Sequence, residues 1–109
     1  MMWTIDYTKG ADRDLSDIYE YISERLLAPE TAAKLINRIL DATDALNYMP
    51  MRHRRYDKEP FRSQGVRVMS VDNYIVLYLP NERTRVVSII RVIYSGRNID
   101  SQLADFANE

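Results

Sequence analysis

The stretch that decides the fold is "RVVSIIRVIYSGRN", residues 85–98. Its first part, 85–94, is a nearly continuous apolar run, which is typical of an interior strand of a sheet. Arg91 interrupts the run, and burying an unpaired guanidinium is costly. Alternation along the strand places Arg91 on the face of Val87 and Ile89. Arg91 is therefore expected either on an open face of the sheet or beside an acidic residue of the first helix.

The other elements follow from the period of the apolar residues. Residues 3–7, "WTIDY", alternate as a half-buried strand does, and from Ala11 the period becomes helical. Pro29 is well placed to begin a second helix, which stops before Pro50. A short link between two helices predicts an antiparallel hairpin. The predicted order is a strand at 3–7, helices at 11–26 and 29–49, strands at 66–72, 73–79 and 85–94, and a short closing helix at 99–107.

This order predicts an α+β fold with two layers. The N-terminal strand and the helical hairpin are expected to pack on a mainly antiparallel four-stranded sheet, which leaves the other sheet face open. With 109 residues, the chain suits one domain, 1–109. Residues 50–64, "PMRHRRYDKEPFRSQ", show no clear period and are predicted to form a basic, mostly irregular loop.

Charge is distributed unevenly along the chain. Residues 1–51 have a net charge of −4, residues 52–97 of +6 and residues 98–109 of −3. Twelve of the fifteen cations are arginines, the better side chain for bidentate contacts with phosphate and carboxylate. The middle of the chain is therefore a candidate surface for an anionic partner, and the alternative is a solvated charged surface.

Several kinds of site are excluded by composition. The chain has no cysteine and a single histidine, His53, so thiolate chemistry, Cys-based metal sites and His-pair metal sites have no residues to build them. No phosphate-binding glycine loop or serine-nucleophile motif occurs, and no cofactor is expected. No signal peptide or membrane-spanning run is seen, which makes the cytoplasm the expected location. Arginine and tyrosine remain, and these suit phosphate binding, base stacking or protein interfaces.

Four stretches together resemble a known family: "DLSDIYEYI" (14–22), "ALNYMP" (45–50), "GVRVMSVDNYIVLYLP" (65–80) and "VVSIIRVIYSGRNI" (86–99). They are similar to toxins of the RelE/ParE superfamily, the toxic half of bacterial type II toxin–antitoxin modules. The most specific feature is an apolar–Arg–apolar strand that ends in a Gly-Arg pair. The resemblance implies a growth-arresting protein with no membrane partner, neutralised in a hetero-oligomer with a cognate antitoxin.

The resemblance also bears on the target. The RelE branch cuts mRNA on the ribosome, whereas the ParE branch poisons DNA gyrase without being a nuclease. Arg67 and Arg97 match two RelE positions, but Met69, Ile75 and Leu103 replace a basic residue, an arginine and an aromatic. DNA gyrase is therefore the favoured target. The alternatives are a ribosome-dependent mRNA endonuclease and a non-toxic antitoxin-binding module, so enzymatic activity stays open.

The candidate site residues fall into two sets. Any nuclease activity would draw on Arg67, Arg97 and His53. Binding of the target or antitoxin would draw on Arg97, Arg91, Arg67, Tyr94, Arg54 and Arg55. The structural alternatives are an ion pair for Arg91, sheet packing for Tyr94 and a solvated loop position for His53.

Overall fold

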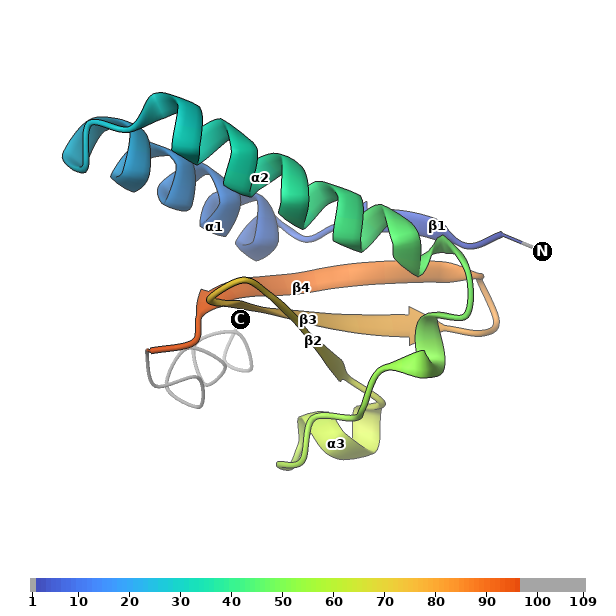
Figure 1. Ribbon diagram of the computed structural model, residues 1–109. Coiled ribbons are helices and arrows are strands. Elements are labelled where there is room, and N and C mark those ends of the chain that lie inside the picture. The colour runs from blue at the N-terminus through green and yellow to red at the C-terminus, as the bar shows by residue number, and fades with distance from the viewer. Residues whose placement is uncertain (1, 97–109) are drawn as a thin grey trace.

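A helical hairpin lies across one face of a four-stranded sheet (Figure 1). The structure is a computed structural model and describes residues 2–96. Helix α1 spans Lys9–Glu20 and continues into a π-helical turn at Tyr21–Arg25, and α2 spans Pro29–Asp44. Two 3-10 turns (Ala45–Asn47 and Pro50–Arg52) and helix α3 (Phe61–Gln64) follow. The closing helix expected at 99–107 lies outside the described residues.

The strands form one mixed sheet in the order β1-β4-β3-β2. They are β1 (Thr4–Tyr7), β2 (Arg67–Val71), β3 (Tyr74–Asn81) and β4 (Val86–Tyr94). The first strand runs parallel to the last, with Thr4 opposite Val86, and the other two pairings are antiparallel. The predicted α+β architecture is confirmed, and β4 is an interior strand as its apolar run indicates.

Thr8 fastens the hairpin to the sheet at the start of α1. Its side-chain oxygen accepts a hydrogen bond from the backbone N–H of Ala11 at 3.1 Å, as an N-cap residue does. The same hydroxyl donates to the carbonyl oxygen of Ile90 at 2.8 Å. One side chain therefore both caps α1 and joins it to the middle of β4.

The main core lies between the hairpin and the sheet. Helix residues of period 3.6 face strand residues of period 2, so both apolar stripes are buried together. The buried members include Ala11, Ile22, Ala32, Leu35, Ile39 and Leu46 from the hairpin side, and Met69, Val76, Tyr78, Val87, Ile89 and Val92 from the sheet.

The expectation of an open second sheet face is wrong. The segment before β2 folds back beneath the sheet, where Tyr56 and Phe61 are buried with Val68, Leu77 and Ile93. The two rings meet edge to face at 6.3 Å. Both contribute large apolar areas, so the loop at 50–64 is anchored by a small core of its own. Figure 1 shows α3 on the side of the sheet opposite the hairpin.

A β-bulge also corrects the predicted alternation of β4. Leu77 lies opposite Arg91 and Tyr78 lies opposite Ile89, so β4 has an extra residue at Ile90. Beyond the bulge the faces exchange, and Val92 rather than Arg91 joins Ile89 in the main core. The Arg91 side chain is therefore not part of the main core and contacts Asp14 of α1 instead.

Candidate functional site

Arg91 forms a two-pronged ion pair with Asp14 of α1. Its Nε donates to Asp14 Oδ2 at 2.7 Å, and its Nη2 donates to Oδ1 at 2.9 Å. The backbone N–H of Val92 also donates to Oδ2 at 2.8 Å. The two side chains are only 16% and 12% exposed. Arg91 therefore has the acidic partner on the first helix that the sequence leads one to expect, and it holds α1 against β4.

Gly10 makes this close approach possible. A Cβ atom at this position would lie 3.1 Å from Cδ of Arg91 and 3.4 Å from the carbonyl oxygen of Ile90. The first distance is tighter than ordinary van der Waals contact and the second lies at its lower limit, so a larger residue would require Arg91 or the helix to shift. Gly10 thus leaves room for the Arg91 side chain beside α1.

Arg67 and Tyr78 fasten the segment 50–53 to the sheet. Nη1 of Arg67 donates to the carbonyl oxygen of His53 at 2.7 Å, and the buried Tyr78 hydroxyl donates to the carbonyl oxygen of Pro50 at 2.7 Å. Burial raises the pKa of Tyr78 to about 12. Arg67 and Tyr78 are paired residues of β2 and β3, so the two hydrogen bonds hold residues 50–53 at one place on the sheet.

His53 lies in a loop, as expected, but it is half-buried rather than fully solvated. Its ring lies edge-on to that of Tyr78, with 6.2 Å between centroids, and its Nε2 atom is buried without a hydrogen-bond partner. Burial lowers the pKa of His53, and the charge of Arg52 lowers it further. An imidazole with a lowered pKa and a covered Nε2 atom is poorly placed to donate a proton from that atom to a substrate.

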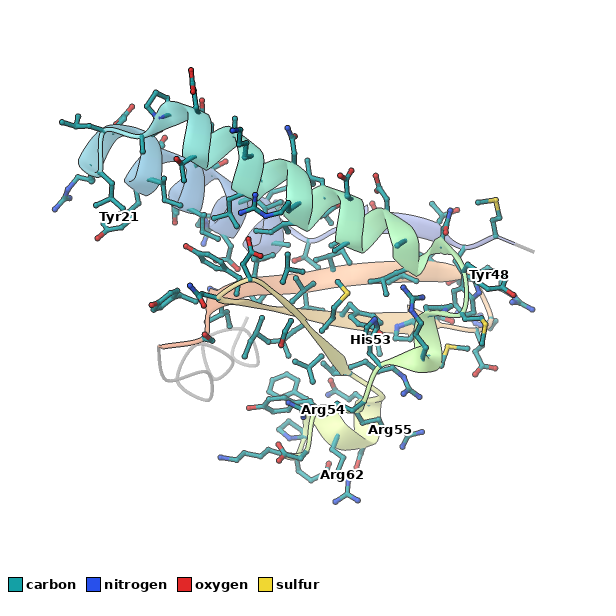
Figure 2. The ribbon with its side chains drawn as sticks, in the orientation of Figure 1. Tyr21, Tyr48, His53, Arg54, Arg55 and Arg62 are labelled. Carbon is teal, nitrogen blue, oxygen red and sulfur yellow. The ribbon has the colours of Figure 1, made fainter. Side chains whose placement is uncertain are left out.

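Three exposed arginines lie around helix α3. Arg54, Arg55 and Arg62 point away from the sheet around α3, on the side opposite the hairpin (Figure 2). Arg55 forms an isolated antiparallel bridge with Arg67 of β2, and the backbone N–H of Val68 donates to the carbonyl oxygen of Arg54 at 3.0 Å. The backbone here is fixed, while the guanidinium groups are displayed to solvent.

Tyr94 lies at the end of β4 and is 46% exposed. Its ring meets Tyr74 edge to face, with 5.6 Å between centroids. A Cβ atom at Gly96 would lie 2.5 Å from Cε2 of Tyr94, so the glycine leaves room for the ring. Tyr94 both packs on the sheet and presents one side to solvent. Arg97 lies outside the described residues.

A shallow groove of about 300 Å³ lies between the two helices of the hairpin. Leu15, Tyr19 and Ile36 supply its apolar lining, and Glu20 supplies a carboxylate. Within residues 2–96, no cluster of three or more His, Asp or Glu side chains could hold a metal ion. None of the helices in that range is both long enough and apolar enough to cross a membrane.

The family model for the "ParE toxin of type II toxin-antitoxin system, parDE" matches residues 5–99. The chain belongs to the ParE toxin family. A search of curated proteins gave no match.

Solved structures of toxin–antitoxin systems share the fold of this ParE-family chain. The chromosomal ParDE system from P. aeruginosa matches at 22% identity with a TM-score of 0.70, over 85% of this chain and 96% of that one. The RelBE2 complex from Mycobacterium tuberculosis also matches at 22% identity, with a TM-score of 0.62, over 86% and 99% of the two chains. At such identities the likeness concerns the fold.

The ParE-family fold separates the predicted site residues. Arg67 and His53 lie together, but Arg67 is hydrogen-bonded to the main chain of His53 rather than aimed at solvent. Arg91 lies elsewhere, on β4, where it is paired with Asp14. Met69 is buried in the main core, and Ile75 packs against the second cluster. The two positions where the RelE branch would carry cations are thus filled by apolar side chains in contact with a core.

Sequence reasoning missed an exposed apolar surface beside the basic segment. Tyr48, Met49 and Met51 are exposed, and Arg52 folds back onto the carbonyl oxygens that precede it. The signal was present as large apolar residues around Pro50 that fit no helical or strand period.

Proposed function

We propose that this ParE-family toxin arrests growth by binding DNA gyrase, and that a cognate antitoxin neutralises it in the cytoplasm. We further propose that residues 1–109 act as a single domain. The proposal rests mainly on the positions of Arg67 and His53, the two described residues that a nuclease site would need. Arg67 donates a hydrogen bond to the main chain of His53, and the Nε2 atom of the half-buried His53 ring is covered. Phosphoryl-transfer chemistry on RNA needs such groups aimed at the substrate.

The binding surface for the target is proposed to include Arg97, Tyr94, Arg54 and Arg55. Arg54 and Arg55 are exposed on a backbone held by β2, and Tyr94 is half exposed at the end of β4. Arginine and tyrosine are enriched among the residues that dominate binding energy at protein interfaces. Arg67 and Arg91 support this surface from within by positioning the segment 50–53 and helix α1.

The experiment that tests this proposal separates two activities in one preparation. Purified protein is added to gyrase with relaxed plasmid and ATP, and separately to a translating extract whose mRNA 5′ ends are mapped. The expected result is loss of supercoiling with accumulation of cleaved plasmid, while the mRNA stays intact. New 5′ ends within translated codons, with normal supercoiling, would instead establish the ribosome-dependent endonuclease. No effect in either assay and no growth arrest on induction would leave the non-toxic antitoxin-binding module.

Arg97 provides the first residue test of the target surface. We expect Arg97→Ala to keep the melting temperature and to weaken growth arrest at matched expression. Arg13→Ala, which removes an exposed arginine from α1, is the control and should arrest growth as the unchanged protein does. Equal toxicity of Arg97→Ala and the unchanged protein would remove Arg97 from the proposed surface.

A further inference from the structure

Large apolar side chains gather at the end of the molecule where the chain leaves α2. Met2, Tyr48 and Met49 are each more than half exposed, and Met51 is 37% exposed. The backbone N–H of Trp3 donates to the carbonyl oxygen of Asn47 at 2.8 Å, so the main chain at Met2 runs close to the main chain at Tyr48. We call Met2, Tyr48, Met49 and Met51 the Met–Tyr surface. Large apolar side chains that are exposed close together are typical of interaction sites.

The backbone beneath the Met–Tyr surface is held in an unfavourable conformation. Met49 has a φ of 48°, in the left-handed region that a methionine rarely adopts. Arg52 folds over this turn and donates to the carbonyl oxygens of Tyr48, Met49 and Ala45. Strained residues persist where their surroundings hold them, and they cluster at functional sites. Arg52 therefore acts as a clamp that keeps the turn in shape.

The chain segment that carries most of the Met–Tyr surface is basic. Residues 48–56 contain three arginines and no acidic residue. Arg85 adds a further exposed guanidinium, which lies 5.1 Å from the ring centre of Trp3, next to Met2. The groove at the hairpin differs, because Glu20 lines it. Of these two apolar surfaces, the Met–Tyr surface is therefore the one whose charge suits an acidic partner.

We propose that the Met–Tyr surface docks a carboxylate-rich segment of the cognate antitoxin, with a large apolar side chain of that segment packed between Tyr48 and Met49. The proposal rests on the toxin function proposed above. Flexible methionines adapt to an apolar side chain, tyrosine supplies a rigid anchor, and the flanking arginines pair with carboxylates. A nucleic acid would use the arginines but leave the apolar side chains in water.

The direct test measures the affinity of the purified product of the neighbouring antitoxin reading frame for two variants. Tyr48→Ala removes the proposed anchor. Tyr21→Ala removes a tyrosine of comparable exposure, 53% against 66%, at the opposite end of the hairpin (Figure 2). We expect Tyr48→Ala to raise Kd by about thirtyfold, as loss of a hot-spot residue does, and Tyr21→Ala to change it less than twofold. Both variants should keep the melting temperature, because both side chains are largely in solvent.

Arg52 tests whether the turn is pre-organised. Arg52→Gln retains a polar side chain but loses the fork that reaches three carbonyl groups. We expect it to raise Kd for the antitoxin about tenfold, mainly by slowing association, because the free turn samples other conformations. Arg13→Gln on α1 is the matched control. Equal antitoxin affinities for the Arg52→Gln and Arg13→Gln variants would show that Arg52 does not pre-organise the turn for binding.

Binding to gyrase is measured on the same variants. An unchanged antitoxin Kd for Tyr48→Ala overturns the proposal, and loss of gyrase affinity alone would assign the Met–Tyr surface to the target instead. Failure of the gyrase proposal leaves the antitoxin measurement interpretable, since Kd for the antitoxin is determined without gyrase. The two proposals therefore fail separately.

Discussion

At the scale of single residues, the contact between Arg91 and Asp14 determines how the hairpin sits on the sheet. The carboxylate accepts three hydrogen bonds, two from the guanidinium and one from the backbone of Val92. The sequence predicts that Arg91 lies either on an open face or beside an acidic residue of the first helix, because an unpaired guanidinium is costly in an apolar strand, and the structure shows the second arrangement. The sequence could not predict how Arg91 reaches that neighbour, since the bulge at Ile90 follows from strand register and not from local pattern.

We expect Arg91→Ala to lower the free energy of unfolding by about 3 kcal/mol, because it leaves a largely buried carboxylate without its cation. Urea unfolding followed by circular dichroism measures the change. The double variant Asp14→Ala/Arg91→Ala should lose clearly less than the sum of the two single variants, since it removes both charges together. Strict additivity of the two losses would contradict a coupled pair.

Tyr78 gives the protein a predictable response to alkaline pH. Its pKa is raised from 10.0 to about 12, chiefly by burial, so folding favours the neutral phenol. Stabilisation from this group is therefore complete below pH 10 and is lost as the pH rises from 10 toward 12. The urea midpoint of the unchanged protein should fall over that range.

Tyr78→Phe is the variant that isolates this effect. It should cost about 1 kcal/mol at neutral pH, through loss of the hydrogen bond to Pro50, and should show a shallower alkaline decline. Some decline will remain, because burial also raises the pKa of Tyr7. Identical alkaline profiles for Tyr78→Phe and the unchanged protein would exclude Tyr78 as the source.

At the scale of elements, the segment between α2 and β2 does more than connect them. It caps the hairpin through Arg52, is held by Arg67 and Tyr78, and covers the second sheet face with Tyr56 and Phe61. Sequence predicts its basic character but not its anchoring. Periodicity identifies helices and strands, whereas two isolated aromatic residues in an irregular segment carry no period to detect.

The junction of α1 and β4 is sensitive to side-chain volume. We expect Gly10→Val to destabilise the protein by about 2 kcal/mol, because the new side chain meets Arg91 and the Ile90 carbonyl. Ala33→Val, a small-to-valine change on the exposed side of α2, is the control and should cost less than about 1 kcal/mol. Thermal unfolding compares the two, and a loss for Gly10→Val no larger than that for Ala33→Val would contradict a close contact at this junction.

At the scale of the whole molecule, opposite charges occupy different regions. The hairpin half is acidic and the half from 52 to 97 is basic, although the net charge is only −1. This separation, the fold class and the family resemblance were all predicted from the sequence, because each sums weak signals over many residues. The Met–Tyr surface was not, since its parts come from Met2 and from residues 48–51, which only the folded chain brings together.

Charge separation predicts salt-dependent recognition of the antitoxin. We expect the association rate constant to fall at least tenfold between about 50 and 500 mM NaCl, while the dissociation rate constant changes little, because the attraction acts during approach. Stopped-flow or surface-based kinetics measures both constants. The variant Arg54→Ala/Arg55→Ala should show a weaker salt dependence, and an association rate independent of salt would contradict electrostatic guidance.

The parallel pairing of β1 with β4 has a consequence for the time course of synthesis. Thr4 pairs with Val86, so β1 cannot join the sheet until nearly the whole described chain has been translated. At roughly 5–20 residues per second, that interval is on the order of 4–16 s. Until then the hairpin lacks the strand against which α1 packs. A nascent chain halted before β4 is therefore expected to be an unfolded substrate for proteases and chaperones, so an incomplete product cannot act as a toxin.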